Sequence, residues 1–151
     1  MNSWLLRDVL VVNEGRVTPA DVLVRDGFIE RVATEGIGNA KSVKEHDAKG
    51  KHLLPGAIDD QVHFREPGLT HKEDIAHGSA AAVAGGITTF MEMPNTIPQA
   101  LTQELLADKY GMGAASSVAN YSFYMGASNT NIDEVLRTDP KTVCGLKAFL
   151  G

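Results

Sequence analysis

The pattern of hydrophobic and polar positions changes after about residue 55 and divides the chain into two parts. Over residues 4–32, short apolar runs rich in β-branched residues are separated by the polar residues 13–15 and by Asp26-Gly27. Asp-Gly between two apolar runs is a hairpin signal, because both turn residues tolerate positive φ. The pattern therefore predicts antiparallel strands, followed over residues 33–50 by a polar surface connection that contains one short strand.

In the second part, apolar segments of strand length alternate with helical patterns. Thr70 and Glu73 have the spacing of a capping box before the first expected helix, and Gly85-Gly86 stops it. Strand and helix repeated with short connections predict right-handed βαβ units and a parallel sheet. The expected strands are residues 57–64, 87–93, 120–125 and 143–150, and the expected helices are residues 75–84, 103–115 and 132–137.

The number of expected strands bears on the fold class. Four parallel strands cannot close a barrel of eight, and the chain stops at Gly151, directly after a strand with no helix to cover it. We therefore interpret the sequence as an α/β fragment, in which residues 56–151 hold the first four strands of a TIM-type (β/α)8 barrel and residues 1–55 form a separate β portion.

Composition and charge narrow the class of partner. Hydrophobic residues at 43% and charged residues at 22% are ordinary for a globular protein. A net charge of -5 argues against nucleic acid and anionic membranes, which favour a basic face, so a small molecule is the expected partner. Cys144 has no partner for an internal disulfide. Arg7 and Asp8 interrupt the apolar start before it reaches signal or membrane-spanning length, and we expect a cytoplasmic protein.

Residues 59–68, DDQVHFREPG, gather polar groups at the end of an expected buried strand. Residues two apart share one face of a strand. The residues that would point one way are Asp59, Gln61, His63 and Arg65. Such a row is costly to bury unless it binds a metal or a charged substrate, or is fully hydrogen-bonded. The alternative is an edge strand with its polar face in water.

Two later residues extend this expected site to other strands. Asn95 follows Pro94 at the end of the second barrel strand, where it is either a site residue or a turn residue. Lys147 is the one lysine within the apolar residues 143–150. A desolvated lysine loses its proton more easily, and the neutral amine reacts with carbon dioxide to give a carbamate that can bridge two metals. The alternative is a lysine that extends to solvent from the strand end.

Five motifs in this order resemble those of dihydroorotases in the cyclic amidohydrolase superfamily. They are LPGAID at residues 54–59, HFREPG at 63–68, AGGITT at 84–89, EMPNT at 92–96 and GLKAFL at 145–150. The resemblance covers residues 53–151, roughly two thirds of the chain. It implies a barrel of the metal-dependent hydrolase kind, with residues 1–55 as part of the small β-sandwich that flanks it.

The resemblance also implies a reaction and roles for particular residues. The reaction is the reversible hydrolysis of dihydroorotate to N-carbamoyl-L-aspartate in pyrimidine biosynthesis, with one or two zinc ions. By resemblance His63 is a metal ligand, Lys147 is the carboxylated bridging lysine, Arg65 and Asn95 hold the substrate carboxylate, and Asp59 supports the first metal-binding strand. Hydantoins, dihydropyrimidines and allantoin lack this carboxylate, so Arg65 favours dihydroorotate.

One position departs from the family pattern. Family members commonly have His-x-His where this chain has Gln61-Val62-His63, and an amide oxygen is a weaker zinc ligand than imidazole. Gln61 is thus either an oxygen ligand or a sign of a degenerate site. A non-catalytic scaffold that binds aspartate transcarbamoylase therefore remains an alternative, as does an enzyme of the allantoinase or hydantoinase type.

Further features are expected outside the chain or away from its site. The family's later histidine ligands and its general acid/base aspartate would lie beyond Gly151, so we expect no turnover from this chain alone. A homo-oligomer is expected by the same resemblance. His52, His71 and His77 are assigned to loop or helix surface. We expect the side chains of the candidate residues on the three strands to converge around one cavity at the barrel mouth.

Overall fold

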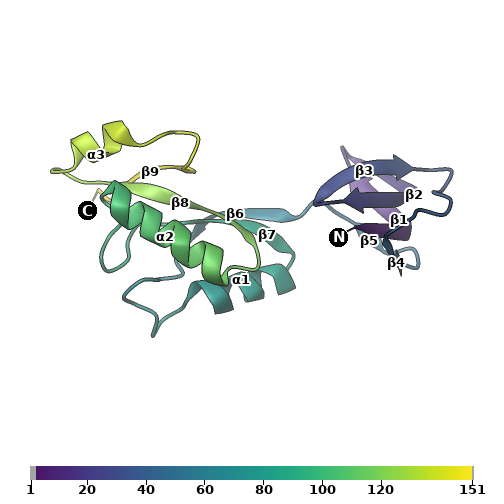
Figure 1. Cartoon of the computed structure of the whole chain (residues 1–151), viewed down its shortest axis with the longest axis horizontal. Helices are drawn as coiled ribbons and strands as arrows, with labels where there is room; N and C mark the ends of the chain where they lie inside the picture. Colours follow the sequence, from purple (N-terminus) through teal and green to yellow (C-terminus); the bar gives the residue numbers. More distant parts are fainter. Residues whose placement is uncertain (1–2, 151) are drawn as a thin grey trace. The chain divides into compact units, whose positions relative to one another are not determined.

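The computed structural model describes residues 3–150 and shows two compact units, one reaching to Pro55 and the other starting at Gly56. The first unit is all-β and the second alternates strands with helices (Figure 1). In the described residues no helix combines the length and the hydrophobicity needed to cross a bilayer.

The first unit is a single five-stranded sheet. Its strands are β1 (Trp4–Asn13), β2 (Arg16–Arg25), β3 (Phe28–Ala33), β4 (Lys44–Asp47) and β5 (His52–Leu53). The order is β3-β2-β1-β4, with β5 also pairing with β1, and the β1–β2 and β2–β3 pairs are antiparallel. Asp26 and Gly27 both have positive φ, at 47° and 87°, which confirms the predicted hairpin turn. The β-sandwich stays a prediction, because residues 3–55 form one sheet.

The second unit is a parallel β/α array. Its elements are β6 (Ala57–Val62), α1 (Ile75–Ala84), β7 (Ile87–Glu92), α2 (Gln103–Ser116), β8 (Asn120–Ala127), α3 (Ile132–Arg137) and β9 (Gly145–Ala148). The strand order is β6-β7-β8-β9, every pairing is parallel, and one helix stands between each pair of consecutive strands. The predicted parallel sheet is thereby confirmed, in the arrangement of a partial (β/α) barrel.

Aromatic side chains pack the helices against this sheet. The buried cluster consists of Ile75, Phe90, Leu106, Phe123 and Met125. The ring of Phe64 lies 4.7 Å from that of Phe90, centroid to centroid. Gly78 of α1 faces the same ring so closely that a Cβ there would lie 2.6 Å from it. The close approach of α1 to the sheet therefore depends on a glycine.

The start of α1 differs from the sequence prediction. The N-cap is Asp74, whose carboxylate accepts the backbone N–H of His77 at 2.8 Å, and not Thr70. The Glu66 carboxylate accepts the N–H of Ile75 at 2.9 Å. The predicted capping box is wrong because both of its residues, Thr70 and Glu73, precede the helix. The carboxylates of Glu66 and Asp74 accept N–H groups of the first turn in place of the predicted box.

Strand β6 also departs from the expected regular alternation. Asp59 pairs with Phe90 and Val62 with Glu92, so β6 has one more residue than β7 between these two positions. The strand ends at Val62, and Arg65 has a left-handed backbone with φ of 69°. The prediction that one face continues regularly from Asp59 to Arg65 is therefore wrong, because the irregular register and the end of the strand break the two-residue period.

Candidate active site

Two predicted site residues meet where β6 and β7 end. His63 directly follows β6, Asn95 lies in the loop after β7, and His63 Nδ1 is 3.0 Å from Asn95 Oδ1. An amide oxygen only accepts, so this contact favours the tautomer of the neutral imidazole with its proton on Nδ1 and its lone pair on Nε2. Both side chains are half-buried. In this tautomer the lone pair of Nε2 can bind a metal ion.

Arg65 lies two residues beyond this histidine. Its backbone N–H donates to Glu92 Oε1 at 3.1 Å, and its carbonyl accepts the N–H of Leu69 at 3.1 Å. Positive φ is uncommon for a residue with a side chain. The last residue of β7 thus holds the backbone of Arg65 in an otherwise unfavourable conformation.

A buried ion pair lies behind these loops. Glu92 is 0% exposed and Lys109 of α2 is 2% exposed, with Glu92 Oε2 and Lys109 Nζ 2.5 Å apart. Lys109 Nζ also donates to the carbonyl of Met93 at 3.2 Å. Desolvation raises the pKa of Glu92 and lowers the pKa of Lys109, and in each case the charge of the partner opposes the shift.

Sequence reasoning did not single out either member of this pair. Glu92 entered only as part of a motif, and Lys109 was not considered. The sequence holds a weak signal, because Lys109 has helical spacing from Leu106 and Gly113, and these three are the buried residues of α2 in the structure. Their spacing is that of one helix face, so the lysine occupies the buried stripe.

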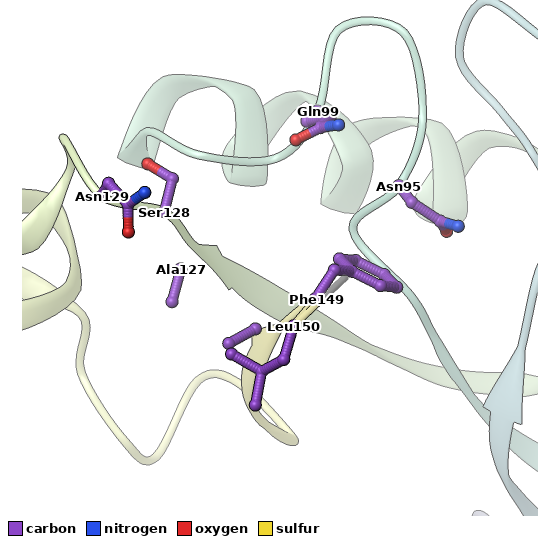
Figure 2. Close-up of a pocket in the computed structure, with 8 residues that line it drawn as sticks. Asn95, Gln99, Ala127, Ser128, Asn129, Phe149 and Leu150 are labelled. Atoms are coloured by element: carbon purple, nitrogen blue, oxygen red, sulfur yellow. The ribbon is translucent and has the colours of Figure 1, made fainter.

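A cavity of about 430 Å³ opens beside the same loops (Figure 2). It is lined by Asn95, Gln99, Ala127, Ser128, Asn129, Ala148, Phe149 and Leu150. These residues come from the loop after β7 and from the ends of β8 and β9. Figure 2 shows the ring of Phe149 extending toward the loop that carries Asn95. Asn95 is thus the predicted site residue that both contacts His63 and lines this cavity.

The remaining predicted residues make other contacts. Lys147 is half-buried in β9, with its Nζ 5.3 Å from the centroid of the Phe149 ring. Gln61 is exposed, and its backbone N–H donates to Asp59 Oδ1 at 3.1 Å. The structure brings His63 and Asn95 into contact, with the backbone of Arg65 close by in the chain, and the convergence of all the candidate side chains around one cavity stays a prediction.

The donor groups of the described residues bear on the predicted metal site. Within residues 3–150, no three His, Cys, Asp or Glu side chains lie together as a metal-binding group would require. A catalytic zinc takes about three protein ligands and a water. His63 supplies one imidazole and Lys147 would need carboxylation, so these residues do not by themselves complete a zinc site. Zinc stays a prediction.

Comparison with known proteins assigns the chain to a family. A family model described as dihydro-orotase-like matches residues 50–125, which include β6, His63, Arg65, Asn95 and the Glu92–Lys109 pair. The chain belongs to the dihydroorotase-like family. The family assignment made from the motifs is confirmed.

Individual relatives of this dihydroorotase-like chain carry three different names. An allantoinase of Desulfitobacterium hafniense (strain Y51) is 38% identical over 146 residues, 96% of this chain and 32% of the relative. A dihydroorotase of Carboxydothermus hydrogenoformans is 48% identical over 91 residues, 60% of this chain and 21% of the relative. The structure of an L-hydantoinase (dihydropyrimidinase) from Arthrobacter aurescens has a TM-score of 0.88 at 26% identity, covering 97% of this chain and 32% of that one.

These matches bear on how much of a relative the chain represents. The chain spans about a third of the length of the allantoinase and of the hydantoinase. Its relatives share the cyclic amidohydrolase family and differ in the named substrate. The comparisons therefore establish the family of the chain but do not identify its substrate.

Proposed function

We propose that this chain forms part of a cyclic amidohydrolase and that its substrate is dihydroorotate, hydrolysed reversibly to N-carbamoyl-L-aspartate in pyrimidine biosynthesis. The observation that carries the proposal is the position of Arg65, two residues beyond the His63–Asn95 contact at the ends of β6 and β7. An arginine there can bind the carboxylate that distinguishes dihydroorotate from allantoin and hydantoins.

The chemistry of the two carboxylate-binding residues supports this choice. A guanidinium presents two parallel N–H groups that match a carboxylate. In Asn95, Oδ1 is engaged with His63 Nδ1, so Nδ2 is the end of the amide that remains to donate. Arg65 and Asn95 together would offer donors to both carboxylate oxygens.

The proposal includes zinc, with His63 Nε2 as one ligand and Lys147 as a second once carboxylated. Bound zinc would polarise the ring carbonyl and supply a hydroxide. Gln61 and Asp59 keep their predicted roles, as an oxygen ligand and a supporting residue, within the proposal. The residues that would complete the metal site and act as general acid/base are expected in the part of the relatives that this chain does not span.

The test compares substrates and arginine variants in the complete protein that contains this chain. We expect turnover of dihydroorotate, and Arg65→Ala should raise KM roughly 10- to 100-fold, the loss of hydrogen bonds to a charged group. Arg137→Ala, which removes an exposed arginine of α3, is the matched control and should leave KM unchanged. An unchanged KM in Arg65→Ala would remove Arg65 from the site.

A second candidate activity is hydrolysis of allantoin or a hydantoin. It is favoured by the allantoinase relative, which matches 96% of this chain at 38% identity. The same assay with allantoin and hydantoin distinguishes the two, because turnover of these and not of dihydroorotate would replace the first proposal. Binding to aspartate transcarbamoylase as a non-catalytic scaffold stays a prediction from Gln61.

A further inference from the structure

The buried Glu92–Lys109 pair connects three segments around the candidate site. Glu92 is the last residue of β7, and its two carboxylate oxygens have different partners. Oε1 accepts the N–H of Arg65 in the loop after β6, whereas Oε2 faces Lys109 Nζ of α2. Lys109 Nζ in turn donates to the carbonyl of Met93, two residues before Asn95. One pair thus holds the loops after β6 and β7 to each other and to α2.

We propose that Glu92 and Lys109 are positioning residues that set the placement of Arg65 and Asn95, and so determine how tightly the site binds a substrate carboxylate. The proposal rests on the proposed function for the identity of that substrate. Neither residue touches the substrate in this proposal; each acts through the backbone of a residue that does.

The backbone of Arg65 explains why a hydrogen-bond acceptor is needed at position 92. Positive φ costs a non-glycine residue free energy, and such a conformation persists only where its surroundings hold it. The Glu92 carboxylate accepts the N–H of Arg65, and the Leu69 N–H binds its carbonyl. An apolar residue at position 92 would fill space but leave the N–H of Arg65 without this acceptor.

The cost of burying the pair supports a role beyond stability. A buried ion pair is often no more stabilising than apolar residues of similar volume, because desolvation offsets the attraction. Here Lys109 is 2% exposed, and its Nζ also lies 5.2 Å from the ring centroid of Phe123. Glu92 and Lys109 fix two loop backbones, which an apolar pair in the same space cannot do.

The experiment measures kinetics and local hydrogen exchange in the complete protein. Glu92→Gln keeps an oxygen for the Arg65 N–H but removes the charge that faces Lys109. We expect it to raise KM for dihydroorotate about tenfold and to change kcat less than threefold. A tenfold rise in KM corresponds to the weakening of one hydrogen bond to a charged group. Amide exchange measured by mass spectrometry should quicken in residues 63–69 and 93–97 and stay unchanged in β8.

Control variants separate this effect from general destabilisation. Asp108→Asn removes the exposed carboxylate next to Lys109 and should leave KM and exchange as in the wild type. If Glu92→Gln does not fold, Lys109→Gln takes its place, with the same expected changes because it removes the counter-ion of Glu92 and the charged donor to Met93.

Two results would overturn the proposal. One is a folded variant with KM and loop exchange within twofold of the wild type. The other is an exchange increase spread evenly over the whole unit, which indicates a purely structural pair. If the protein turns over no dihydroorotate at all, the proposed function fails, while the exchange pattern still decides whether Glu92 holds the two loops.

Discussion

At the scale of single residues, the start of α1 couples helix capping to pH. The Asp74 carboxylate accepts the backbone N–H of His77 and lies 2.7 Å from His77 Nδ1. Hydrogen bonding to His77 lowers the pKa of Asp74, and the same carboxylate raises the pKa of His77, with a smaller contribution from Glu73. The pair is thus strongest where the carboxylate is ionised and the imidazole is protonated.

This coupling predicts a pH-dependent effect of His77→Gln. The contribution of His77 is fully present below its unfolded-state pKa of about 6.5 and is lost as pH rises through its higher folded value. The contribution of Asp74 is present above its unfolded pKa of about 3.9 and is lost as pH falls through its lower folded value. The difference in unfolding midpoint between wild type and His77→Gln should therefore be larger at pH 5.5 than at pH 8.5.

The measurement is thermal unfolding at both pH values, followed by circular dichroism. His71→Gln serves as control, because His71 is also exposed and precedes the helix. Equal differences for His77→Gln at the two pH values would contradict an ionic contact with Asp74.

At the scale of elements, small residues control how closely helices approach the sheet. Gly78 of α1 faces the ring of Phe64, which packs against Phe90. Gly111 of α2 is a helical glycine, and apart from its chain neighbours and its own helix backbone no atom lies within 4 Å of its would-be Cβ. Replacing glycine by alanine gains helix propensity at both positions, but the added methyl group meets the Phe64 ring at Gly78 and open space at Gly111. Comparing the two variants therefore separates helix propensity from packing.

Alanine at these two positions should change stability in opposite directions. Gly78→Ala should lower the free energy of unfolding by about 1–3 kcal/mol, because Phe64 must move from its packed position. Gly111→Ala should raise it by up to about 1 kcal/mol through helix propensity. Urea denaturation of both variants is the measurement, and a stabilising Gly78→Ala would show that Phe64 repacks freely.

At the scale of the whole molecule, the second unit has exposed apolar residues on both outer strands of its sheet. Ile58 of β6 is 62% exposed and Leu146 of β9 is 53% exposed. Unpaired strand edges with apolar residues are sites where chains associate. Among residues 3–150, β6 and β9 are the outer strands of this sheet, and each pairs with a neighbouring strand on one side only.

The 151-residue chain by itself should therefore associate in a concentration-dependent way. Sedimentation velocity over a range of concentrations should show oligomers, and Leu146→Lys should shift the distribution toward monomer. Leu136→Lys is the matched control, since Leu136 is 76% exposed but lies on helix α3 and not on an outer strand of the sheet. A monomer at all concentrations would exclude the edges as contact sites.

Features that depend on neighbours in the chain were predictable from the sequence. Asp26-Gly27 predicted the hairpin turn, and the alternation of apolar runs and helical patterns predicted the order β6 to β9 with its helices. The motifs placed His63 and Asn95 at the same rim, and the structure shows them in contact. These features were predictable because turn preference and hydrophobic period are set by a few neighbouring residues, and the order of the strands follows from the order of such segments along the chain.

Other features were decided only by the tertiary structure. Asp74 caps α1 in place of Thr70, β6 loses its regular alternation before Arg65, and Lys109 meets Glu92 in the interior. Each depends on which distant groups compete for the same hydrogen bond or are removed from water together. Period and propensity describe one segment at a time, whereas desolvation and register are set by the segments packed against it, and these are known only in the folded chain.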